Sequence, residues 1–142
     1  MKTVQQMLMQ MDIALWYVKP EATVFEALKL MSEAGIGAVL VMEGGRLAGI
    51  FSERDYARKV ALEGRDSRTT TVSEIMTRDV LCVSPDTSTE ECMAIMVSKR
   101  FRHLPVVKDS EVIGMISIRD LMADIMEERE VTIKQLESYI YS

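Results

Sequence analysis

The stretch Gly49-Ile-Phe-Ser-Glu-Arg-Asp55 recurs 65 residues later as Gly114-Met-Ile-Ser-Ile-Arg-Asp120. The same offset aligns the chain with itself, without a gap, from Val18 to Arg58. Two unrelated amphipathic segments would not stay in register through a helix, two strands and their turns. The alignment therefore indicates a duplicated supersecondary unit, and such a repeat decides the architecture.

A weaker repeat lies upstream of the strong one. The segment Thr3-Val-Gln-Gln-Met-Leu-Met9 resembles Thr71-Val-Ser-Glu-Ile-Met-Thr77, at an offset of 68. The change of offset predicts three extra residues in the first copy, near Asp12 to Trp16.

Each copy reads as strand, helix, strand, strand and helix. In the first copy the capping box Thr23-x-x-Glu26 predicts the start of a helix, and Gly35 predicts its end. The apolar run 36–42 predicts a buried strand, followed by a turn at Gly44-Gly45 and a second strand over 47–51. Ser52-x-x-Asp55 predicts the cap of a helix that runs to about Leu62.

The second copy follows the same order, with its turn at Asp109-Ser110. The polar segment 63–71 reads as the linker. Apolar residues at helical spacing over 131–141 predict a terminal helix that packs back on the module or on a second copy. We therefore predict an α+β fold with repeats at 1–65 and 66–128, a helical tail at 129–142, and helices at both ends.

Composition narrows the class of protein. The 142 residues are 48% hydrophobic and 27% charged, with a net charge of −5, as expected of a globular chain. Nucleic-acid binders usually carry a basic surplus, so we expect no nucleic acid as partner. No apolar run approaches the roughly 20 residues of a membrane helix, and the first residues do not resemble a signal peptide. We expect no membrane association and a cytoplasmic location.

The repeated motif places a serine and an aspartate where a strand passes into a helix. The N–H groups of a helix start favour an anion, and an aspartate can accept hydrogen bonds from the two hydroxyls of a ribose. The arginine before it can reach a phosphate, and Gly49 and Gly114 could let a flat ring approach the backbone. The same Ser-x-x-Asp spacing is also an ordinary helix cap. Both interpretations stand at this point.

The duplicated unit, the two motifs and the strand Arg102-His103-Leu104-Pro105-Val106-Val107 resemble a tandem pair of CBS domains, often named a Bateman module. The resemblance covers nearly the whole chain and extends to the stand-alone bacterial type. It implies two βαββα repeats packed through their sheets about a pseudo-twofold axis, with two clefts between them. In each cleft one repeat binds the ribose of an adenine nucleotide and the other holds its base.

Carrying the resemblance over residue by residue gives two sets of candidates. The ribose and phosphate contacts are Ser52, Arg54, Asp55, Ser117, Arg119, Asp120, Arg102 and His103. The adenine pockets are formed by Val18, Thr23, Ile36, Gly37, Ala38, Ile50, Val83, Ser88, Phe101 and Met115. The resemblance pairs Asp120 with residues 36–38 in one cleft and Asp55 with residues 101–103 in the other.

The two clefts are expected to differ. Gly37 and Ala38 of the first repeat align with Arg102 and His103 of the second. We therefore predict that bulk and charge lie only in the cleft of Asp55, which would prefer a phosphate-rich ligand. The other cleft would have room for something larger or neutral.

The implied function is a sensor for AMP, ADP, ATP, NAD or S-adenosylmethionine, with no obligatory cofactor. The alternative is a ligand-independent dimerisation or adaptor module, in which the motifs only cap helices. In either case we expect a homodimer and an unidentified downstream protein. We expect no catalytic residues and no metal site, because Cys82 and Cys92 lack metal-binding spacing and His103, the sole histidine, has no evident catalytic partner.

Overall fold

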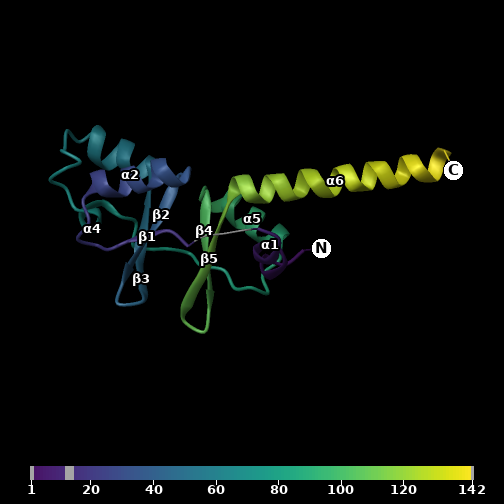
Figure 1. The fold of residues 1–142 in the computed structure, drawn as a ribbon, viewed down its shortest axis with the longest axis horizontal. Coiled ribbons are helices and arrows are strands. Elements are labelled where there is room, and N and C mark those ends of the chain that lie inside the picture. Colours follow the sequence, from purple (N-terminus) through teal and green to yellow (C-terminus); the bar gives the residue numbers. More distant parts are fainter. Residues whose placement is uncertain (1, 12–14, 142) are drawn as a thin grey trace.

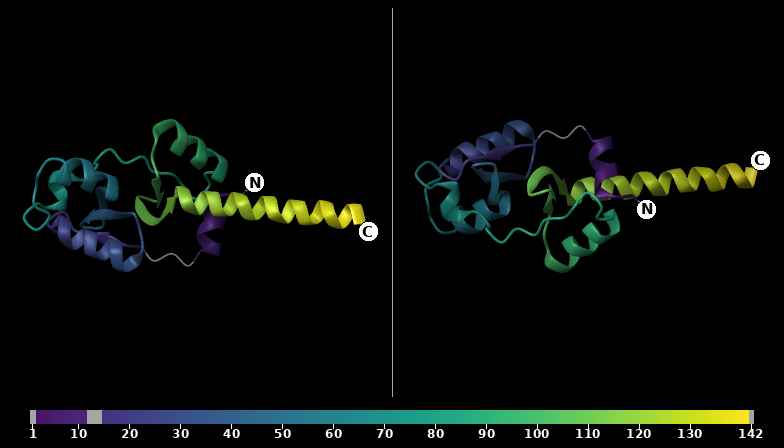
Figure 2. Two further views of the ribbon diagram at one scale, coloured as in Figure 1. Left: turned by 90° about the horizontal axis from the view of Figure 1, so that it is seen from above. Right: turned by 90° about the horizontal axis from the view of Figure 1, so that it is seen from below.

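The computed structural model describes residues 2–11 and 15–141. Two small sheets stand next to each other, each backed by helices, and one long helix extends away from the second sheet (Figure 1). The views from above and below show the same arrangement (Figure 2). The predicted insertion near Asp12 to Trp16 falls partly outside the described residues. The elements are α1 Val4–Gln10, β1 Tyr17–Val18, α2 Val24–Ala34, β2 Ala38–Glu43, β3 Arg46–Ser52, α3 Glu53–Asp55, η1 Tyr56–Ala61, α4 Val72–Ile75, α5 Thr89–Lys99, β4 His103–Lys108, β5 Glu111–Ser117 and α6 Ile118–Tyr141.

The two copies share one pairing scheme. In the first sheet, β1 runs parallel to β2 and β2 antiparallel to β3. In the second, β4 pairs antiparallel with β5, and Val83 supplies a single parallel bridge to Val106 in the place of β1. A bulge interrupts both hairpins at equivalent points, after Val41 and after Val106. The α+β fold of two β-α-β-β-α repeats predicted from the sequence is therefore confirmed.

The local signals read from the sequence are also confirmed. Thr23 accepts a hydrogen bond from the Glu26 amide and forms a complete capping box, and Gly35 ends that helix with a left-handed backbone. Gly44 and Gly45 form the predicted turn with positive φ. The helix predicted to run from Ser52 to about Leu62 exists, but from Tyr56 its hydrogen bonds widen to the π pattern in η1.

Each hydrophobic core includes a short helix that lies outside its own repeat in the sequence. The core of the first sheet includes Val72 and Ile75 of α4, whereas that of the second includes Val4 and Met7 of α1. The backbone bonds match, because the Val72 amide donates to Ala22 O and the Val4 amide to Thr87 O, both at 2.8 Å. Each core thus combines residues from both of the predicted ranges, 1–65 and 66–128. These domain bounds stay a prediction.

The two motif glycines serve chain packing. A Cβ atom on Gly49 would lie 2.6 Å from Thr77 O, and one on Gly114 would lie 2.9 Å from Leu8 Cδ2. Neither glycine lines a cavity between the repeats. The prediction that they admit a flat ring is therefore wrong: each is small because another part of the chain crosses it.

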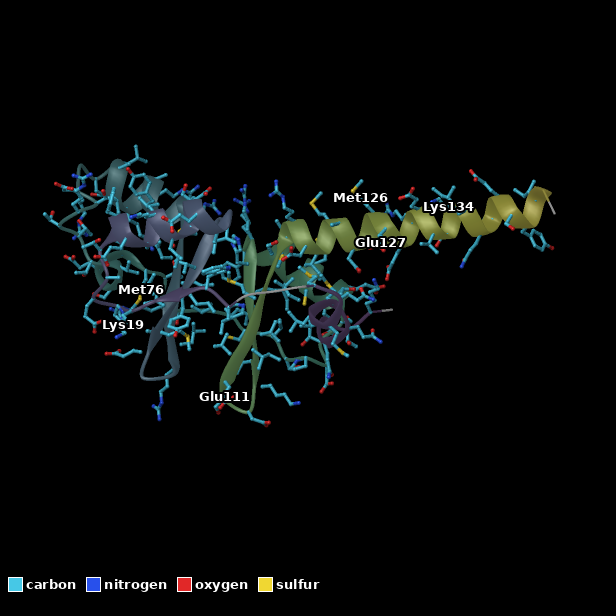
Figure 3. The ribbon with its side chains drawn as sticks, viewed as in Figure 1. Lys19, Met76, Glu111, Met126, Glu127 and Lys134 are labelled. Carbon is cyan, nitrogen blue, oxygen red and sulfur yellow. The ribbon has the colours of Figure 1, made fainter. Side chains whose placement is uncertain are left out.

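Only the first part of the long helix α6 packs on the module, where Leu121 is buried in the second core. It is continuous through residues 128–129, and every residue over 126–140 is exposed. Side chains including Met126, Glu127 and Lys134 project from it into solvent (Figure 3). This half of the prediction is wrong, and packing on a second copy stays a prediction. No helix of the described residues is both long and apolar enough to cross a membrane.

Candidate functional site

Two cavities of similar size lie between the repeats. The first, about 630 Å³, contains Asp55 and is named here the Asp55 cleft. The second, about 590 Å³, contains Asp120 and is named the Asp120 cleft. Each is bordered by the motif of one repeat and by the strand start of the other, which follows from the pseudo-twofold arrangement of the two sheets.

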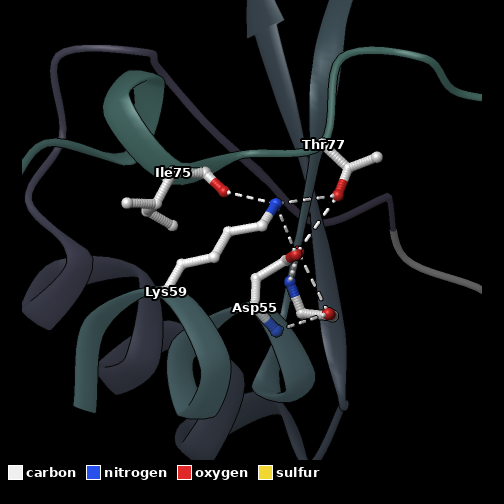
Figure 4. A network of polar contacts seen from close by, with 5 residues as sticks. Asp55, Lys59, Ile75 and Thr77 are labelled. Atoms are coloured by element: carbon white, nitrogen blue, oxygen red, sulfur yellow. Dashed lines mark hydrogen bonds and ion pairs between the residues drawn. The ribbon is translucent and has the colours of Figure 1, made fainter. Parts of the chain in front are cut away.

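In the Asp55 cleft the motif aspartate is already engaged (Figure 4). Its Oδ2 accepts bonds from the Ser52 amide and hydroxyl, both at 3.0 Å. Its Oδ1 lies 3.0 Å from the Lys59 ammonium and accepts a 3.2 Å bond from Thr77 Oγ1. Lys59 also donates to Ile75 O at 3.1 Å. The carboxylate is thus held by a neighbouring cation from its own helix and by a hydroxyl from the segment after α4.

In the Asp120 cleft the motif aspartate has fewer partners. Asp120 Oδ2 accepts a 2.9 Å bond from the Ser117 amide, and Ser117 Oγ accepts one from the Asp120 amide at 3.1 Å. In the described part of the chain, Asp120 Oδ1 makes no hydrogen bond or ion pair. This oxygen is available to a ligand hydroxyl without the displacement of another group.

The structure brings most of the predicted site residues to the clefts. Ile50, Ser52, Arg54, Asp55 and Phe101 line the Asp55 cleft. The Asp120 cleft is lined by Ile36, Ala38, Met115, Ser117, Arg119 and Asp120. The pairing of Asp55 with residues 101–103, and of Asp120 with residues 36–38, matches this geometry.

Four predicted residues line neither cavity. Val18 pairs with Val41 inside the first sheet, and Val83 is buried against Val106. Thr23 and Ser88 are occupied as helix caps, each accepting a 3.1 Å bond from a backbone amide. Strand pairing and helix capping thus engage these four residues, and their assignment to the adenine pockets stays a prediction.

The segments just before these positions border the clefts instead. Thr77, Asp79, Val80 and Leu81 line the Asp55 cleft, and Met11, Leu15 and Trp16 line the Asp120 cleft. The sequence signal for them was the upstream repeat, because these residues follow the two short helices, whose segments pack over the motif glycines through Thr77 O at Gly49 and the Leu8 side chain at Gly114. Because the two copies differ in length in this region, they could not be aligned residue by residue at these positions.

Arg102 and His103 border both clefts, together with Gly37 and Glu53. The prediction that their bulk and charge lie in one cleft only is therefore wrong: the start of β4 stands between the two cavities. Burial lowers the pKa of His103, opposed by the Asp120 carboxylate and reinforced by the Arg102 cation. The imidazole is accordingly neutral at pH 7.

Four cations of the Asp55 cleft were not among the site residues predicted from the sequence. Arg58, Lys59, Lys99 and Arg100 line it in addition to the predicted arginines. A sequence signal existed for Lys59, since it lies one helical turn after Asp55 and on the same face. For Arg100 the signal was its alignment with Gly35, where a helix-ending glycine is replaced by a charged residue.

The cysteines have no evident chemical role. Cys92 is buried, and burial raises its pKa to about 11, so the thiol stays protonated. Cys82 is half-buried, and burial raises its pKa as well. Among residues 2–11 and 15–141 no group of three or more His, Cys, Asp or Glu side chains is arranged to hold a metal ion.

Comparison with known proteins gives consistent matches. The sequence profile of the CBS domain matches residues 5–62 and 72–132. A mitochondrial CBS domain-containing protein of Arabidopsis thaliana, CBSX3, is 39% identical over 131 residues, which are 89% of this chain and 63% of that protein. The chain thus spans less than two thirds of that relative.

Solved structures match the fold. A protein with CBS domains from Burkholderia ambifaria is 47% identical, with a TM-score of 0.86, over 89% of this chain and 95% of that one. The CBS domain pair of protein MJ0100, solved with 5′-methylthioadenosine and S-adenosyl-L-methionine, has a TM-score of 0.78 at 22% identity, over 89% and 98% of the two chains. At that identity the likeness concerns the fold alone.

Proposed function

Since the chain belongs to the CBS domain family, we propose that it is a regulatory module that binds an adenosyl ligand in the clefts between its two repeats. The observation that carries the proposal is the pair of cavities of about 600 Å³, each with a Ser-x-x-Asp motif on one wall. Small-molecule sites usually measure about 300–1,000 Å³. A nucleoside fits in such a space.

The chemistry of the walls supports an adenosyl group. The free Oδ1 of Asp120 can accept a hydrogen bond from a ribose hydroxyl, and the motif backbone already fixes its carboxylate through Ser117. Apolar residues of the facing repeat, such as Ile36 and Trp16, offer a surface for a flat base. The ligands of the MJ0100 domain pair carry the same adenosyl group, which adds support from a related fold.

Regulation would follow from the position of the clefts. A ligand that contacts both repeats stabilises one relative placement of the two sheets over others, and only such a difference in affinity can shift a conformational equilibrium. Arg54 Nη1 already joins the repeats by a 3.5 Å bond to Arg100 O. A downstream protein would sense the change. We expect this binding role, without catalysis, in the cytoplasm.

A homodimer is part of the proposal. Met122, Met126, Ile133, Leu136 and Ile140 are each at least half exposed on α6. Their spacing of three, four or seven residues places them on one helical face, as in a coiled-coil seam. A second copy that packs along this face would bury it. Sedimentation should give a dimer at micromolar concentration, and Ile133→Asp combined with Leu136→Asp should give a monomer that keeps its fold.

Calorimetric titration with AMP, ATP, NAD, S-adenosylmethionine and 5′-methylthioadenosine tests the binding proposal. Binding should stabilise the fold by about 2.7 kcal/mol at a ligand concentration 100-fold above Kd, visible as a raised Tm. Asp55→Asn and Asp120→Asn should each remove binding in one cleft. If none of the five ligands binds, the motifs serve as helix caps and the adaptor role replaces the proposed one.

A further inference from the structure

The residue four positions after the motif aspartate reverses its charge between the copies. In the first copy it is Lys59, whose ammonium lies 3.0 Å from Asp55 Oδ1. In the second copy the equivalent residue is Asp124, which instead pairs with Lys2 at 2.6 Å and does not line the Asp120 cleft. A ligand hydroxyl must therefore compete with a cation for Asp55, whereas Asp120 is free of one.

The charge of the two linings differs in the same direction. The Asp120 cleft has two cations, Arg102 and Arg119, and two carboxylates, Glu53 and Asp120, so its charges balance. The Asp55 cleft has three carboxylates, Glu53, Asp55 and Asp79, and twice as many cations, for a net charge of about +3. These cations are Arg54, Arg58, Lys59, Lys99, Arg100 and Arg102. Because the cavities have nearly equal volumes, charge and not size separates them.

One of these cations stands in an unfavourable backbone conformation. Arg100 ends α5 with φ 59° and ψ 32°, at the position where the first copy has Gly35 with φ 68° and ψ 37°. A side chain in this left-handed region costs roughly 1–2 kcal/mol relative to the ordinary helical one. A charged residue is kept where glycine would be easier, and its side chain lines the Asp55 cleft.

Apolar side chains line both clefts, and those of the Asp120 cleft include an indole. Leu15 and Trp16, with relative exposures of 36% and 41%, line the Asp120 cleft together with Met11 and Met115. Such a lining suits a thioether or alkyl group, and the face of an indole also attracts a sulfonium cation. It offers few partners to a chain of phosphates.

We propose that the two clefts sort adenosyl ligands by the charge of the group at the ribose 5′ position. The Asp55 cleft takes a nucleoside polyphosphate, and the Asp120 cleft takes an adenosyl ligand whose 5′ group has no phosphate. Lys59 enforces the choice: a polyphosphate attracts its ammonium away from Asp55 and leaves that carboxylate to the ribose, whereas a neutral ligand leaves Lys59 paired with Asp55. This inference rests on the proposed function and adds the ligand class of each cleft.

The test is calorimetry with ATP and 5′-methylthioadenosine as probes. In the wild type each probe should bind at a stoichiometry of one, and saturating ATP should leave 5′-methylthioadenosine binding intact. Lys59→Met should weaken ATP about tenfold or more, because a hydrogen bond to a charged group is lost. The same variant should raise the 5′-methylthioadenosine stoichiometry toward two, because Asp55 loses its competing cation and keeps only the neutral donors Ser52 and Thr77. A merely destabilising substitution would not produce these opposite changes.

Lys19→Met is the matched control, since Lys19 is exposed, lines neither cleft and makes the same charge change. It should leave both probes unaffected. Competition of the two probes for one cleft, or equal weakening of both by Lys59→Met, would overturn the sorting while the binding function stands. If neither probe binds the wild type, the proposed function itself fails. The wild-type competition does not depend on how well any variant folds.

Discussion

The two motif aspartates occupy equivalent positions in the two copies, yet both carboxylate oxygens of Asp55 are engaged and only one of Asp120 is. Asp55 is held by Lys59 and Thr77, whereas Asp120 retains an unbonded carboxylate oxygen. The difference arises outside the motif, at the residue one helical turn later and in the segment that crosses the motif glycine. A duplicated fold can therefore keep one architecture and still give its two sites different chemistry.

The largest loss of stability is expected at the Lys2–Asp124 ion pair of the second repeat. Asp124 stands at the position that Lys59 has in the first repeat. Asp124 is 8% exposed, and its Oδ2 has no hydrogen-bond partner among the described residues. Removing one partner of a fully buried pair costs roughly 3–5 kcal/mol. Because the Lys2 side chain keeps 22% exposure, we expect Lys2→Met to lower the free energy of unfolding by less than this range, about 2 kcal/mol, in urea denaturation.

The pH dependence of this pair has a defined sign. The hydrogen bond from Lys2 to Asp124 raises the pKa of Lys2, against the effect of burial. A raised pKa means that the stabilisation is complete below the unfolded value near 10.5 and is lost as the pH rises through the folded value. Lys2→Met should remove this alkaline loss, and an unchanged alkaline profile would contradict the role given to Lys2.

The motif glycines should respond unequally to alanine. The new Cβ of Gly49→Ala would meet Thr77 O of the backbone, whereas that of Gly114→Ala would meet the movable end of Leu8. We expect about 2 kcal/mol of destabilisation for Gly49→Ala and less than about 1 kcal/mol for Gly114→Ala. Chemical denaturation of both variants measures the difference, and equal losses would show that the crossing at Thr77 yields as readily as a side chain.

The two helix ends permit a reciprocal exchange. Arg100→Gly should stabilise the fold by about 0.5–1 kcal/mol, because relief of the left-handed strain exceeds the entropy cost of glycine. Gly35→Ala should destabilise it through backbone strain alone, since no atom lies within 4 Å of the added Cβ. Thermal unfolding checks both. If Arg100 contributes to the Asp55 cleft, its replacement should also weaken ATP, so stability and affinity should change in opposite directions.

The smallest expected change is in the pKa of His103, which borders both clefts. Its pKa is lowered by burial, so its contribution to stability is present above about pH 6.5 and declines as the pH falls through the folded value. As the sole histidine, it gives one imidazole signal in a proton NMR titration. Asp120→Asn should lower this pKa further, because the carboxylate raises it, whereas bound ATP should raise it. An imidazole pKa that changes neither with Asp120→Asn nor with bound ATP would contradict the position of His103 between the clefts.

Much of the molecule could be predicted from the sequence. The repeated motif, the capping boxes and the hairpin glycines are local signals, and the backbone bonds they predict are those observed. The facing of Asp55 and residues 101–103 followed from the resemblance to paired CBS domains, since a pseudo-twofold axis brings each motif to the opposite repeat. Local chemistry and duplication are both visible in a linear chain.

Other parts depend on what folding places around a residue. Val18, Thr23, Val83 and Ser88 were assigned to the adenine pockets; in the structure they take part in strand pairing and helix capping and line neither cavity, and their assignment stays a prediction. The exposure of α6 was also missed, because apolar spacing predicts a face and not the partner that covers it.

The sequence by itself determined the duplication, the order of elements and the two motifs, since these rest on periodicity and hydrogen bonds between near neighbours. Only the tertiary structure decided which groups surround each motif. The Lys2–Asp124 pair, the crossing of Gly49 by Thr77 and the shared position of His103 join residues from different elements or different copies. The charge of a cleft is the sum over the side chains that folding brings together, and neither repeat alone contains all of these side chains.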